Sequence, residues 1–359
     1  MNNLIDMTEF ASKIVLRPNS PFLNRILERI YDKWDTTACV HDRWGTMKKW
    51  VDRYKNGASF EEMLSCSEAD AYGKWCLSLN AEYTPDNIDD KKKEIVNMIV
   101  SIAKGGYSED KWPKDARWYP IRTSIDGMGL LHTFDGAHRM MILTALGMET
   151  PSMARFVPDT FQKAISSLSS LYQPSCHPCV QSLSVNRKDL VRYQVISDAM
   201  KNLRINSACE IGCAEGEGLI VLAKSGAKMT GIENEDSRFA LAQALCKVTG
   251  KAEVKKELKK TQEHDAYIGL SVWHHLGKSL QDLNDWIDLT KHAKFQFVEM
   301  PEPMSKTFKQ PLIDDTGWKW ENVGEEILQY IIKVGKYTKS EILYVDKKYA
   351  NRKTILISR

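Results

Sequence analysis

The chain has 359 residues, of which 43% are hydrophobic and 27% are charged, and its formal net charge is +3. These values are typical of a folded protein with room for two domains, and the small charge gives no general argument for nucleic-acid binding. No stretch approaches the roughly 18 apolar residues of a membrane helix. The polar, acidic start, MNNLIDMTE, is unlike a signal peptide. We expect a cytoplasmic protein without a membrane span, whose oligomeric state composition leaves open.

The eight cysteines are scattered along the chain without the spacing of a disulfide framework. One close pair, Cys176 and Cys179 in CHPC, has the spacing of zinc ligands. A structural zinc site needs four ligands, and no second pair is present in the sequence. We therefore expect ordinary cysteines in a linker and no metal site.

The first 105 residues predict a helical N-terminal region. Apolar residues recur at helical spacing over 22–34, 43–54 and 91–103, and the last of these helices ends at Gly105-Gly106. Each of these helices has one apolar face, so the region should pack as a unit with the domain that follows it.

From Trp112 the pattern changes to short strands. Residues 118–125 and 130–134 flank Asp126-Gly127, which predicts a β-hairpin. A short helix over 140–146 and a strand over 152–157 complete an expected α+β domain at 106–160. Serines and prolines in 161–190 predict a connector.

The remaining segment, 191–359, predicts an α/β domain with a Rossmann-like sheet. From Ser207 apolar strands alternate with amphipathic helices, which indicates a parallel, doubly wound sheet. The last two strands, 342–345 and 354–358, predict a closing antiparallel hairpin.

A glycine-rich turn follows the first strand of this domain, in ACEIGCAEGEG (208–218). Glycines allow a ligand to approach the backbone closely, and Glu233, at the end of the next strand, is placed to accept hydrogen bonds from both hydroxyls of a ribose. A dinucleotide site needs G-x-G-x-x-G, but Gly216-x-Gly218 is followed by Val221 at the required position. The pattern favours a nucleoside ligand other than NAD.

The pattern Glu210-x-Gly212-x-Ala214-x-Gly216 resembles the first motif of class I S-adenosylmethionine-dependent methyltransferases, with alanine in place of the middle glycine. The resemblance implies that Glu210 lies near the methionine moiety, Gly212 lies under the cofactor and Glu233 binds the ribose. It does not place the adenine contact. The expected cofactor-binding residues are Tyr172, Glu210, Gly212, Ala214, Gly216, Glu233 and Ser271.

Three segments, EIGCAEGEG, IGLSVWHHL and FVEMPEP, resemble the methyltransferase half of bacterial O-antigen chain-terminating kinase–methyltransferases, as does LYQPSCHP just before the domain. The Asn/Asp-Pro-Pro-aromatic tetrad of amino-directed nucleic-acid methyltransferases is absent from the fourth strand. The resemblance implies a glycan terminus or a related small molecule, methylated on a hydroxyl or a phosphate, and it disfavours nucleic acid.

Two histidines at the end of that fourth strand, His275 and His274, are the candidate general bases for a hydroxyl acceptor. Packing and a hydrogen bond at a helix start are the alternative roles for them. A phosphate acceptor needs only positioning, and the candidate acceptor-binding residues are Arg192, Lys278 and Glu299. Glu299 could instead be a solvated charge that closes a strand.

The first half carries FDGAHRMMILTALG (134–147), in which charged residues stand between a strand and a short helix. A helix start offers free N–H groups, so the stretch outlines an anion site. Alternatively, it is a structural turn in which Asp135 caps the helix and Arg139 pairs with a nearby acid.

This stretch resembles the ParB/sulfiredoxin-like superfamily, whose members carry Asp-Gly-x-His-Arg before a helix and include ATP-dependent kinases. The resemblance implies a nucleotide-phosphate site formed by Asp135, Gly136, His138 and Arg139, with Asp135 and His138 as catalytic candidates and Mg-ATP as a second cofactor. Ala137 stands where sulfiredoxins have cysteine, which excludes sulfinic-acid reduction. For the acid that a kinase needs upstream, Asp115 and Asp126 are only guesses.

Together the two halves predict a bifunctional enzyme, in which a ParB-like kinase domain precedes a methyltransferase domain. The alternative is a methyltransferase with a single activity, whose first half is a non-catalytic module that binds the acceptor or a nucleic acid.

Overall fold

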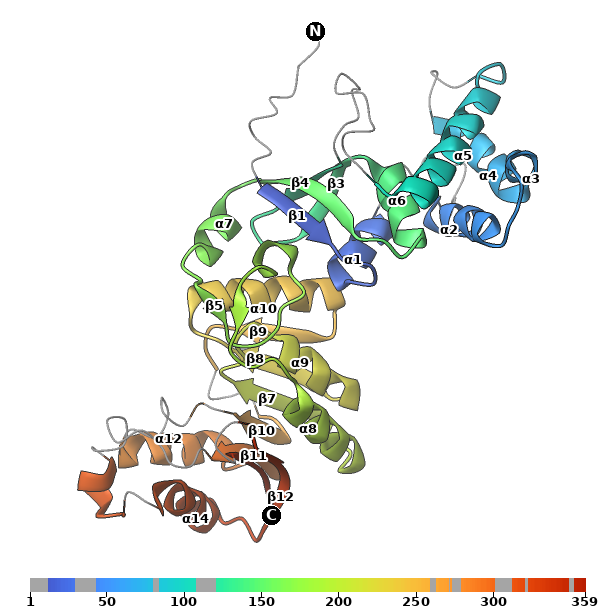
Figure 1. Cartoon of the computed structure of the whole chain (residues 1–359). Helices are drawn as coiled ribbons and strands as arrows, with labels where there is room; N and C mark the ends of the chain where they lie inside the picture. Colours follow the sequence, from blue (N-terminus) through green and yellow to red (C-terminus); the bar gives the residue numbers. More distant parts are fainter. Residues whose placement is uncertain are drawn as a thin grey trace. The chain divides into compact units, whose positions relative to one another are not determined.

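The chain folds into two compact units, which are described separately (Figure 1). Unit 1 comprises 1–163 and 176–181, and unit 2 comprises 164–175 and 182–359. The expected connector therefore contributes to both units. The computed structural model describes residues 12–29, 43–79, 84–107, 121–258, 263–270, 272, 279–300, 312–319, 322–348 and 352–359.

Unit 1 contains a four-stranded sheet in the order β1-β4-β2-β3. The expected hairpin is present, since β2 (Arg122–Ile125) pairs antiparallel with β3 (Leu131–Asp135). Strand β4 (Thr150–Phe156) lies parallel to β2. Strand β1 (Ser12–Leu16), which the sequence pattern did not predict, pairs antiparallel with β4. The short apolar run KIVL forms a strand because β4 offers it an edge.

The helices of unit 1 pack around buried aromatic and aliphatic side chains. Trp50 is fully buried, and its indole N–H donates to the backbone oxygen of Met63 at 2.9 Å. The expected helices over 43–54 and 91–103 are present as α2 and α5. The expected helix over 22–34 corresponds to α1, which ends at Arg29, because 30–34 lie outside the described residues. The helices are α1 (Pro21–Arg29), α2 (Arg43–Lys55), α3 (Phe60–Leu64), α4 (Ser67–Leu79), α5 (Ile88–Gly105), α6 (Ala137–Ala145) and α7 (Thr160–Ile165), the last of which extends into unit 2.

The expected connector, 161–190, contains ordered elements rather than a bare linker. Two short strands, β5 (Ser170–Leu171) and β6 (Ser184–Val185), pair in parallel, and a 3-10 helix, η3 (Pro178–Val180), comes between them in the sequence. The serines and prolines predicted an irregular segment. Hydrogen bonds from its backbone to Glu215, described below, hold part of it in a defined conformation.

Unit 2 contains a seven-stranded sheet in the order β12-β13-β11-β10-β7-β8-β9. Strand β13 runs antiparallel to both of its neighbours, β11 and β12, and the other pairs are parallel, so the expected parallel, doubly wound sheet and the closing hairpin are both present. This is a Rossmann-like fold. The strand order reverses between β7 and β10, where such folds bind ligands at the carboxyl ends of the strands. The strands are β7 (Ser207–Ile211), β8 (Lys228–Ile232), β9 (Ala252–Lys255), β10 (Ala266–Gly269), β11 (Phe295–Met300), β12 (Lys339–Asp346) and β13 (Arg352–Ser358).

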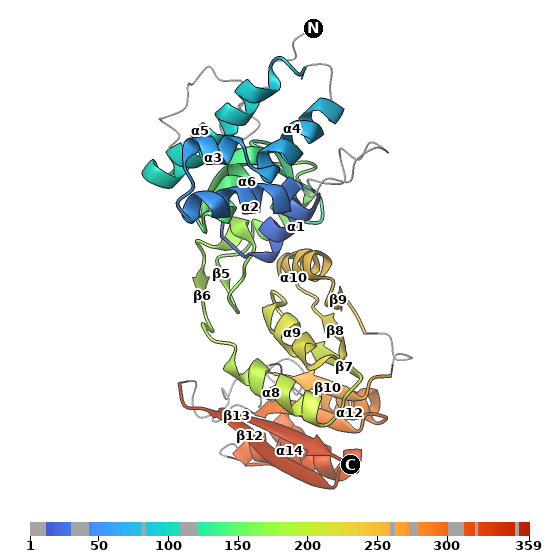
Figure 2. The same cartoon turned by 90° about the vertical axis from the view of Figure 1, so that its right-hand side faces the viewer.

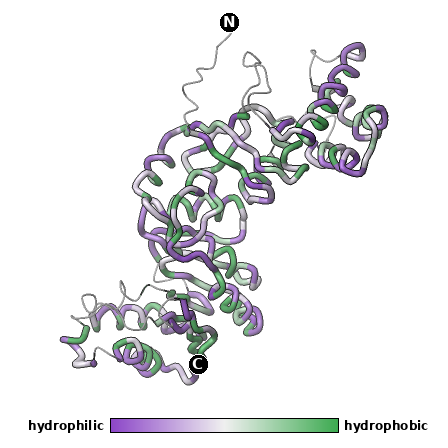
Figure 3. The backbone as a smooth tube through the Cα atoms, in the orientation of Figure 1, coloured by the Kyte–Doolittle hydropathy of each residue, from purple (hydrophilic) through white to green (hydrophobic). Residues whose placement is uncertain are grey.

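Helices cover both faces of this sheet (Figure 2). The short 3-10 helix η4 (Ala223–Ser225) follows α9. Hydrophobic runs, green along the tube in Figure 3, alternate with hydrophilic ones in strands and helices alike. Parallel strands buried on both faces need such continuous apolar runs, and all of β10 is buried. One face packs against α8 (Val191–Asn202), α9 (Glu217–Leu222) and α10 (Asp236–Thr249), the other against α12 (Leu280–Thr290) and α14 (Val323–Gly335).

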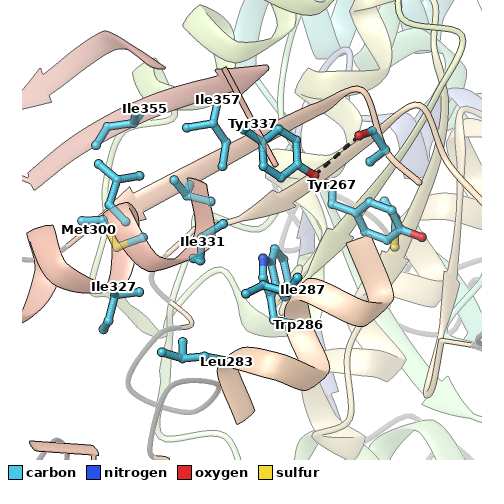
Figure 4. Close-up of a cluster of buried hydrophobic side chains, with 14 of the residues drawn as sticks. Tyr267, Leu283, Trp286, Ile287, Met300, Ile327, Ile331, Tyr337, Ile355 and Ile357 are labelled. Atoms are coloured by element: carbon cyan, nitrogen blue, oxygen red, sulfur yellow. Dashed lines mark hydrogen bonds between the residues drawn. The ribbon is translucent and has the colours of Figure 1, made fainter. Parts of the chain in front are cut away.

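The core on the α12–α14 face is a cluster of buried aliphatic and aromatic side chains, among them Trp286 and Tyr337 (Figure 4). The indole N–H of Trp286 donates to Oε1 of Gln296 at 2.9 Å, and Nε2 of Gln296 donates to the Tyr337 hydroxyl at 2.6 Å. Because buried polar groups are costly without partners, this network ties α12 to β11 and the start of the last hairpin. No described helix has the length and apolarity that crossing a membrane requires.

Candidate functional site

The glycine-rich turn at the carboxyl end of β7 has a backbone that side chains would block. Gly212 has a φ of 72°, and a Cβ on it would lie 2.6 Å from Cγ1 of Val272. Gly216 has a φ of 85°, and its Cβ would lie 3.0 Å from the backbone of Ala242. Ala214, between these two glycines, adopts a left-handed φ of 49°. The turn is thus a strained, closely packed cradle at the switch point of the sheet.

Glu233 follows β8 directly and fastens this turn. One carboxylate oxygen accepts the backbone N–H of Ala214 at 2.9 Å, and the other accepts the N–H of Glu235 at 2.9 Å. The side chain is buried, with 7% exposed. A carboxylate oxygen can accept two hydrogen bonds, so each retains capacity for a ligand hydroxyl. The bond to Ala214 explains how a residue with a side chain is held at positive φ, and binding of a ribose by Glu233 stays a prediction.

Glu210, in β7, has a buried carboxyl group that lacks hydrogen-bond partners within the described residues. Only 1% of the residue is exposed, and neither carboxylate oxygen has a hydrogen bond of normal geometry within the described part of the chain. Burial raises the pKa of Glu210 to about 7, opposed by hydrogen bonding from Tyr193 and the charge of Arg192 and reinforced by the charge of Glu233. A cationic ligand would relieve this burial cost.

Two buried side chains, which the sequence did not predict as site residues, fix residues 171–175 to the glycine turn. The carboxylate of Glu215 accepts the backbone N–H groups of Tyr172 at 2.7 Å and Gln173 at 2.9 Å. Gln173 in turn accepts the N–H of Gly218 at 2.9 Å and donates to the Tyr193 hydroxyl at 2.6 Å. The expected cofactor residue Tyr172 is thereby held beside the turn.

The expected acceptor residues Arg192 and Glu299 contact each other in a buried ion cluster. Arg187 and Arg192 both donate to the Glu299 carboxylate, which is 1% exposed, and Arg187 does so at 3.0 Å. Arg352 lies 3.5 Å from the same carboxylate, and Asp346 lies 3.9 Å from Arg187. The solvated strand end considered for Glu299 is therefore wrong, because three guanidinium groups surround it. Arg192 is engaged here rather than open for an acceptor.

Arg192 also connects this cluster to the segment before the domain. Its Nη2 lies 3.4 Å from both the Tyr172 and the Tyr193 hydroxyls. Burial alone would raise the pKa of Glu299, but the charges of Arg192 and Arg187 outweigh it and hold that pKa below its ordinary value. Glu299 is accordingly an ionised structural centre. The other predicted residues at this edge, Ser271, His274, His275 and Lys278, lie outside the described residues.

In unit 1 the start of α6 gathers cationic groups. Gly136 occupies the N-cap position of α6 with a φ of 79°, and the alternative role of Asp135 as the helix cap stays a prediction. Asp135 ends β3, and its side chain lies outside the described residues. Arg139 is buried in the first turn, and its Nη2 would lie 3.1 Å from a Cβ on Gly136. Asp126, one of the guesses for a catalytic acid, instead accepts two backbone N–H groups of the hairpin turn and faces His132 at 3.0 Å.

His138 is enclosed by the neighbouring helices. Its Nε2 accepts from Nη2 of Arg43 at 2.8 Å and lies 3.1 Å from the Tyr72 hydroxyl. Arg43 also stacks over the Trp75 ring at 4.2 Å. Burial, together with the charges of Arg43, Lys91 and Arg139, holds the pKa of His138 well below its ordinary value. His138 is therefore a neutral acceptor amid positive charge.

The CHPC segment is built around a histidine whose nitrogens are both used. His177 contacts the backbone oxygen of Gly129 through Nε2 at 3.0 Å and accepts the Cys179 N–H at Nδ1 at 3.3 Å. Phe22 and Phe161 pack against the ring. Within the described residues no group of three or more metal-binding side chains is present. His177 is a core residue here, and burial lowers its pKa to about 4.

Comparisons with known proteins identify no family for the chain. No family model and no curated protein matches it. One similar solved structure is that of monomeric WbdD, with a TM-score of 0.42 and 20% identity. The match covers 55% of this chain and 48% of that one. Another structure of WbdD describes it as a bifunctional kinase-methyltransferase. The methyltransferase domain of bacterial CtHen1 has a TM-score of 0.37 and 15% identity over 48% of this chain and 100% of that one.

Magnesium protoporphyrin IX methyltransferase from Synechocystis, solved with bound S-adenosylmethionine, has a TM-score of 0.36 and 16% identity over 47% of this chain and 78% of that one. The chain spans about half of the WbdD structure that it matches. At these scores the fold of unit 2 is established by its own strand order rather than by likeness.

Proposed function

We propose that unit 2 binds S-adenosylmethionine and transfers its methyl group to a hydroxyl or a phosphate. The observation that carries this proposal is Glu210, a buried carboxylate lacking a partner of normal geometry in the described chain, beside a turn where a side chain at Gly212 would collide with Val272. S-adenosylmethionine carries an ammonium and a sulfonium charge next to a nucleoside, which matches a buried acid beside a close-packed cradle.

The described residues divide the work of binding. Glu210 faces the cationic methionine part, the turn from Gly212 to Gly216 lies under the ligand, and Glu233 accepts from the ribose hydroxyls. Tyr172, held by Glu215, flanks the methionine part. When bound, the cofactor would supply an electrophilic methyl group, so the protein has mainly to align the acceptor with it.

The residues proposed to act on the acceptor are His275, with His274 as the second candidate, and Lys278. A hydroxyl acceptor would need one of the histidines as a base, whereas an ionised phosphate would need only a cation to hold it. Arg192 and Glu299 position Tyr172 through their ion pair in this proposal and do not contact the acceptor. A glycan terminus is the acceptor class that the sequence resemblance favours.

Calorimetric titration with S-adenosylhomocysteine tests the binding step. We expect Glu233→Gln to weaken binding by about 1–3 kcal/mol, the cost of a lost hydrogen bond to a charged group, while the matched change Glu235→Gln leaves it unchanged. Gly212→Ala should abolish binding because its Cβ would lie 2.6 Å from Cγ1 of Val272, which forces the turn proposed to lie under the ligand to shift. Equal affinities in all of these proteins would contradict the proposal. For the transfer step, His275→Ala should slow methylation without changing the affinity.

A second candidate activity is ATP-dependent phosphoryl transfer by unit 1, which would make the enzyme bifunctional. The supporting observation is the cluster of Arg43, Lys91 and Arg139 around His138 at the start of α6, since phosphate groups bind where cations and helix N–H groups converge. Micromolar binding of Mg-ATP that is lost in Arg43→Ala and Arg139→Ala would support it. Absence of binding in the unaltered protein would leave unit 1 as an acceptor-binding module.

A further inference from the structure

Residues 171–175, the strap, are held against the glycine turn by the carboxylate of Glu215, which is fully buried. One of its oxygens accepts the N–H of Tyr172 at 2.7 Å, and the other accepts the N–H of Gln173 at 2.9 Å. The carboxylate thus places one acceptor atom before each of two neighbouring N–H groups. A glutamine in its place would set an NH2 group against one of these donors.

The carbonyl groups of the strap are fixed as well. The carbonyl of Tyr172 accepts the N–H of Arg187 at 2.9 Å, and the carbonyl of Leu171 accepts the N–H of Asn186 at 2.9 Å. These bonds extend the parallel pairing of β5 with β6. The Tyr172 hydroxyl lies 3.4 Å from Nη2 of Arg192. Tyr172 is therefore held at its N–H, its carbonyl and its hydroxyl.

The strap directs one side chain away from the interior of unit 2. Leu171 and Gln173 are 1% and 0% exposed, whereas Tyr172 between them is half-buried. Successive side chains of an extended segment point to opposite sides, so Tyr172 faces away from its two buried neighbours. Gln173 locks this orientation, because its Oε1 accepts the N–H of Gly218 at 2.9 Å. Of these three strap residues, Tyr172 alone presents its side chain outside the packed interior.

Tyr172 lies on the side of the turn where Glu210 is. Arg192, which faces the Tyr172 hydroxyl, is also close enough to Glu210 for its charge to favour the ionised carboxylate. Glu233, proposed for the ribose, is bonded instead to the N–H of Ala214. Because Glu210 is proposed to face the methionine part of the ligand, Tyr172 adjoins that same part.

We propose that Glu215 is a positioning residue, which holds Tyr172 against the amino-acid part of the ligand and so makes unit 2 selective for ligands that carry this part. This inference rests on the proposed function. Glu215 acts through the peptide groups of the strap and does not contact the ligand itself. A strap that is ordered before the ligand arrives lowers the entropy cost of the contact, and the gain appears as affinity. A nucleoside without the amino-acid part does not reach Tyr172 and gains nothing from this order.

Amide hydrogen exchange of the full chain, followed by mass spectrometry, tests the clamp without a ligand. In Glu215→Gln one strap N–H loses its acceptor, so exchange in 170–175 should be about five- to tenfold faster, as one lost hydrogen bond implies. Glu235→Gln is the matched control, because Arg238 lies 3.8 Å from Glu215 and 3.0 Å from Glu235. It removes a carboxylate from Arg238 without touching the strap, whose exchange should not change. Unchanged exchange in Glu215→Gln would overturn the proposal.

Calorimetric titration then compares two ligands. Glu215→Gln should weaken S-adenosylhomocysteine about tenfold, the cost of ordering a loosened strap, and leave methylthioadenosine, which lacks the amino-acid part, unchanged. Tyr172→Ala should show the same selective loss, and Glu215→Gln should add little to it, because Glu215 acts through Tyr172. Equal losses for both ligands, which a merely structural role would cause, or additive losses in the double variant, would overturn the proposal.

The same titrations separate this inference from the proposed function. If the unaltered protein binds neither ligand, the proposed function fails and the inference fails with it. If it binds both and Glu215→Gln leaves both affinities unchanged, the inference alone fails. Should Glu215→Gln not fold, as thermal unfolding would show, Gln173→Leu replaces it, because it frees the strap from Gly218. The selective loss is expected there too, and the same change at the exposed Gln194 of α8 should leave both affinities unchanged.

Discussion

Replacing Glu299 by glutamine should destabilise unit 2 strongly, because this carboxylate alone faces three guanidinium groups. Arg187, Arg192 and Glu299 are each at least 95% buried, and Arg352 is the more exposed third partner. Removing one member of a buried ion pair costs about 3–5 kcal/mol, since the other charge stays buried without compensation. Glutamine has nearly the same shape as glutamate, so the loss of stability would measure the effect of removing the charge and not a change in packing.

Differential scanning calorimetry would measure this change in the full chain. For a unit of this size, 3–5 kcal/mol corresponds to a fall in Tm of about 6–20 °C. Glu341→Gln, on the exposed side of β12 in the same sheet, is the matched control and should change Tm by less than about 2 °C. A similar small change for Glu299→Gln would show that water screens the cluster and would refute the reasoning.

The same cluster predicts a pH dependence. Because the pKa of Glu299 lies below its ordinary value in the folded protein, its contribution to stability is complete above the unfolded pKa. It is lost as the pH falls through the lower, folded pKa. Glu299→Gln should therefore flatten the acid limb of the stability profile of unit 2, and an unchanged limb would contradict this assignment.

Two further predictions concern packing and a buried histidine. Gly218→Ala should destabilise unit 2 by about 1–3 kcal/mol, because the new Cβ would lie 2.4 Å from the Tyr193 ring. At Gly226 the space is open but φ is 91°, so Gly226→Ala should cost only the backbone strain, about 1–2 kcal/mol. Urea denaturation measures the free energy of unfolding of both variants. His177 should destabilise unit 1 as the pH falls from about 6.5 to about 4, because its lowered pKa means that only the unfolded chain takes up the proton there. Thermal unfolding of His177→Gln should lack this portion of the pH dependence.

The sequence by itself determined the elements whose causes are local. Continuous apolar strands alternating with helices from Ser207 specify a parallel sheet, because both of its faces must be covered. The glycines of the first turn and Glu233 at the next strand end could be located because positive φ and a strand-end acid have signatures in single residues. The hairpin turn at Asp126-Gly127 was predictable for the same reason.

Tertiary structure alone decided which distant groups meet. The run KIVL becomes β1 only because β4 offers an edge, and 164–175 belongs to unit 2 because Glu215 accepts two of its backbone N–H groups. The ion cluster joins Arg187 and Glu299 across more than a hundred residues, so no local pattern could reveal it. Hydrogen bonds and ion pairs form only between groups that are close in space, whatever the number of residues between them in the sequence. The sequence therefore located the glycine-rich turn that we propose as the binding site, and only the fold identified Gln173, Tyr193 and Glu215 as the residues around it.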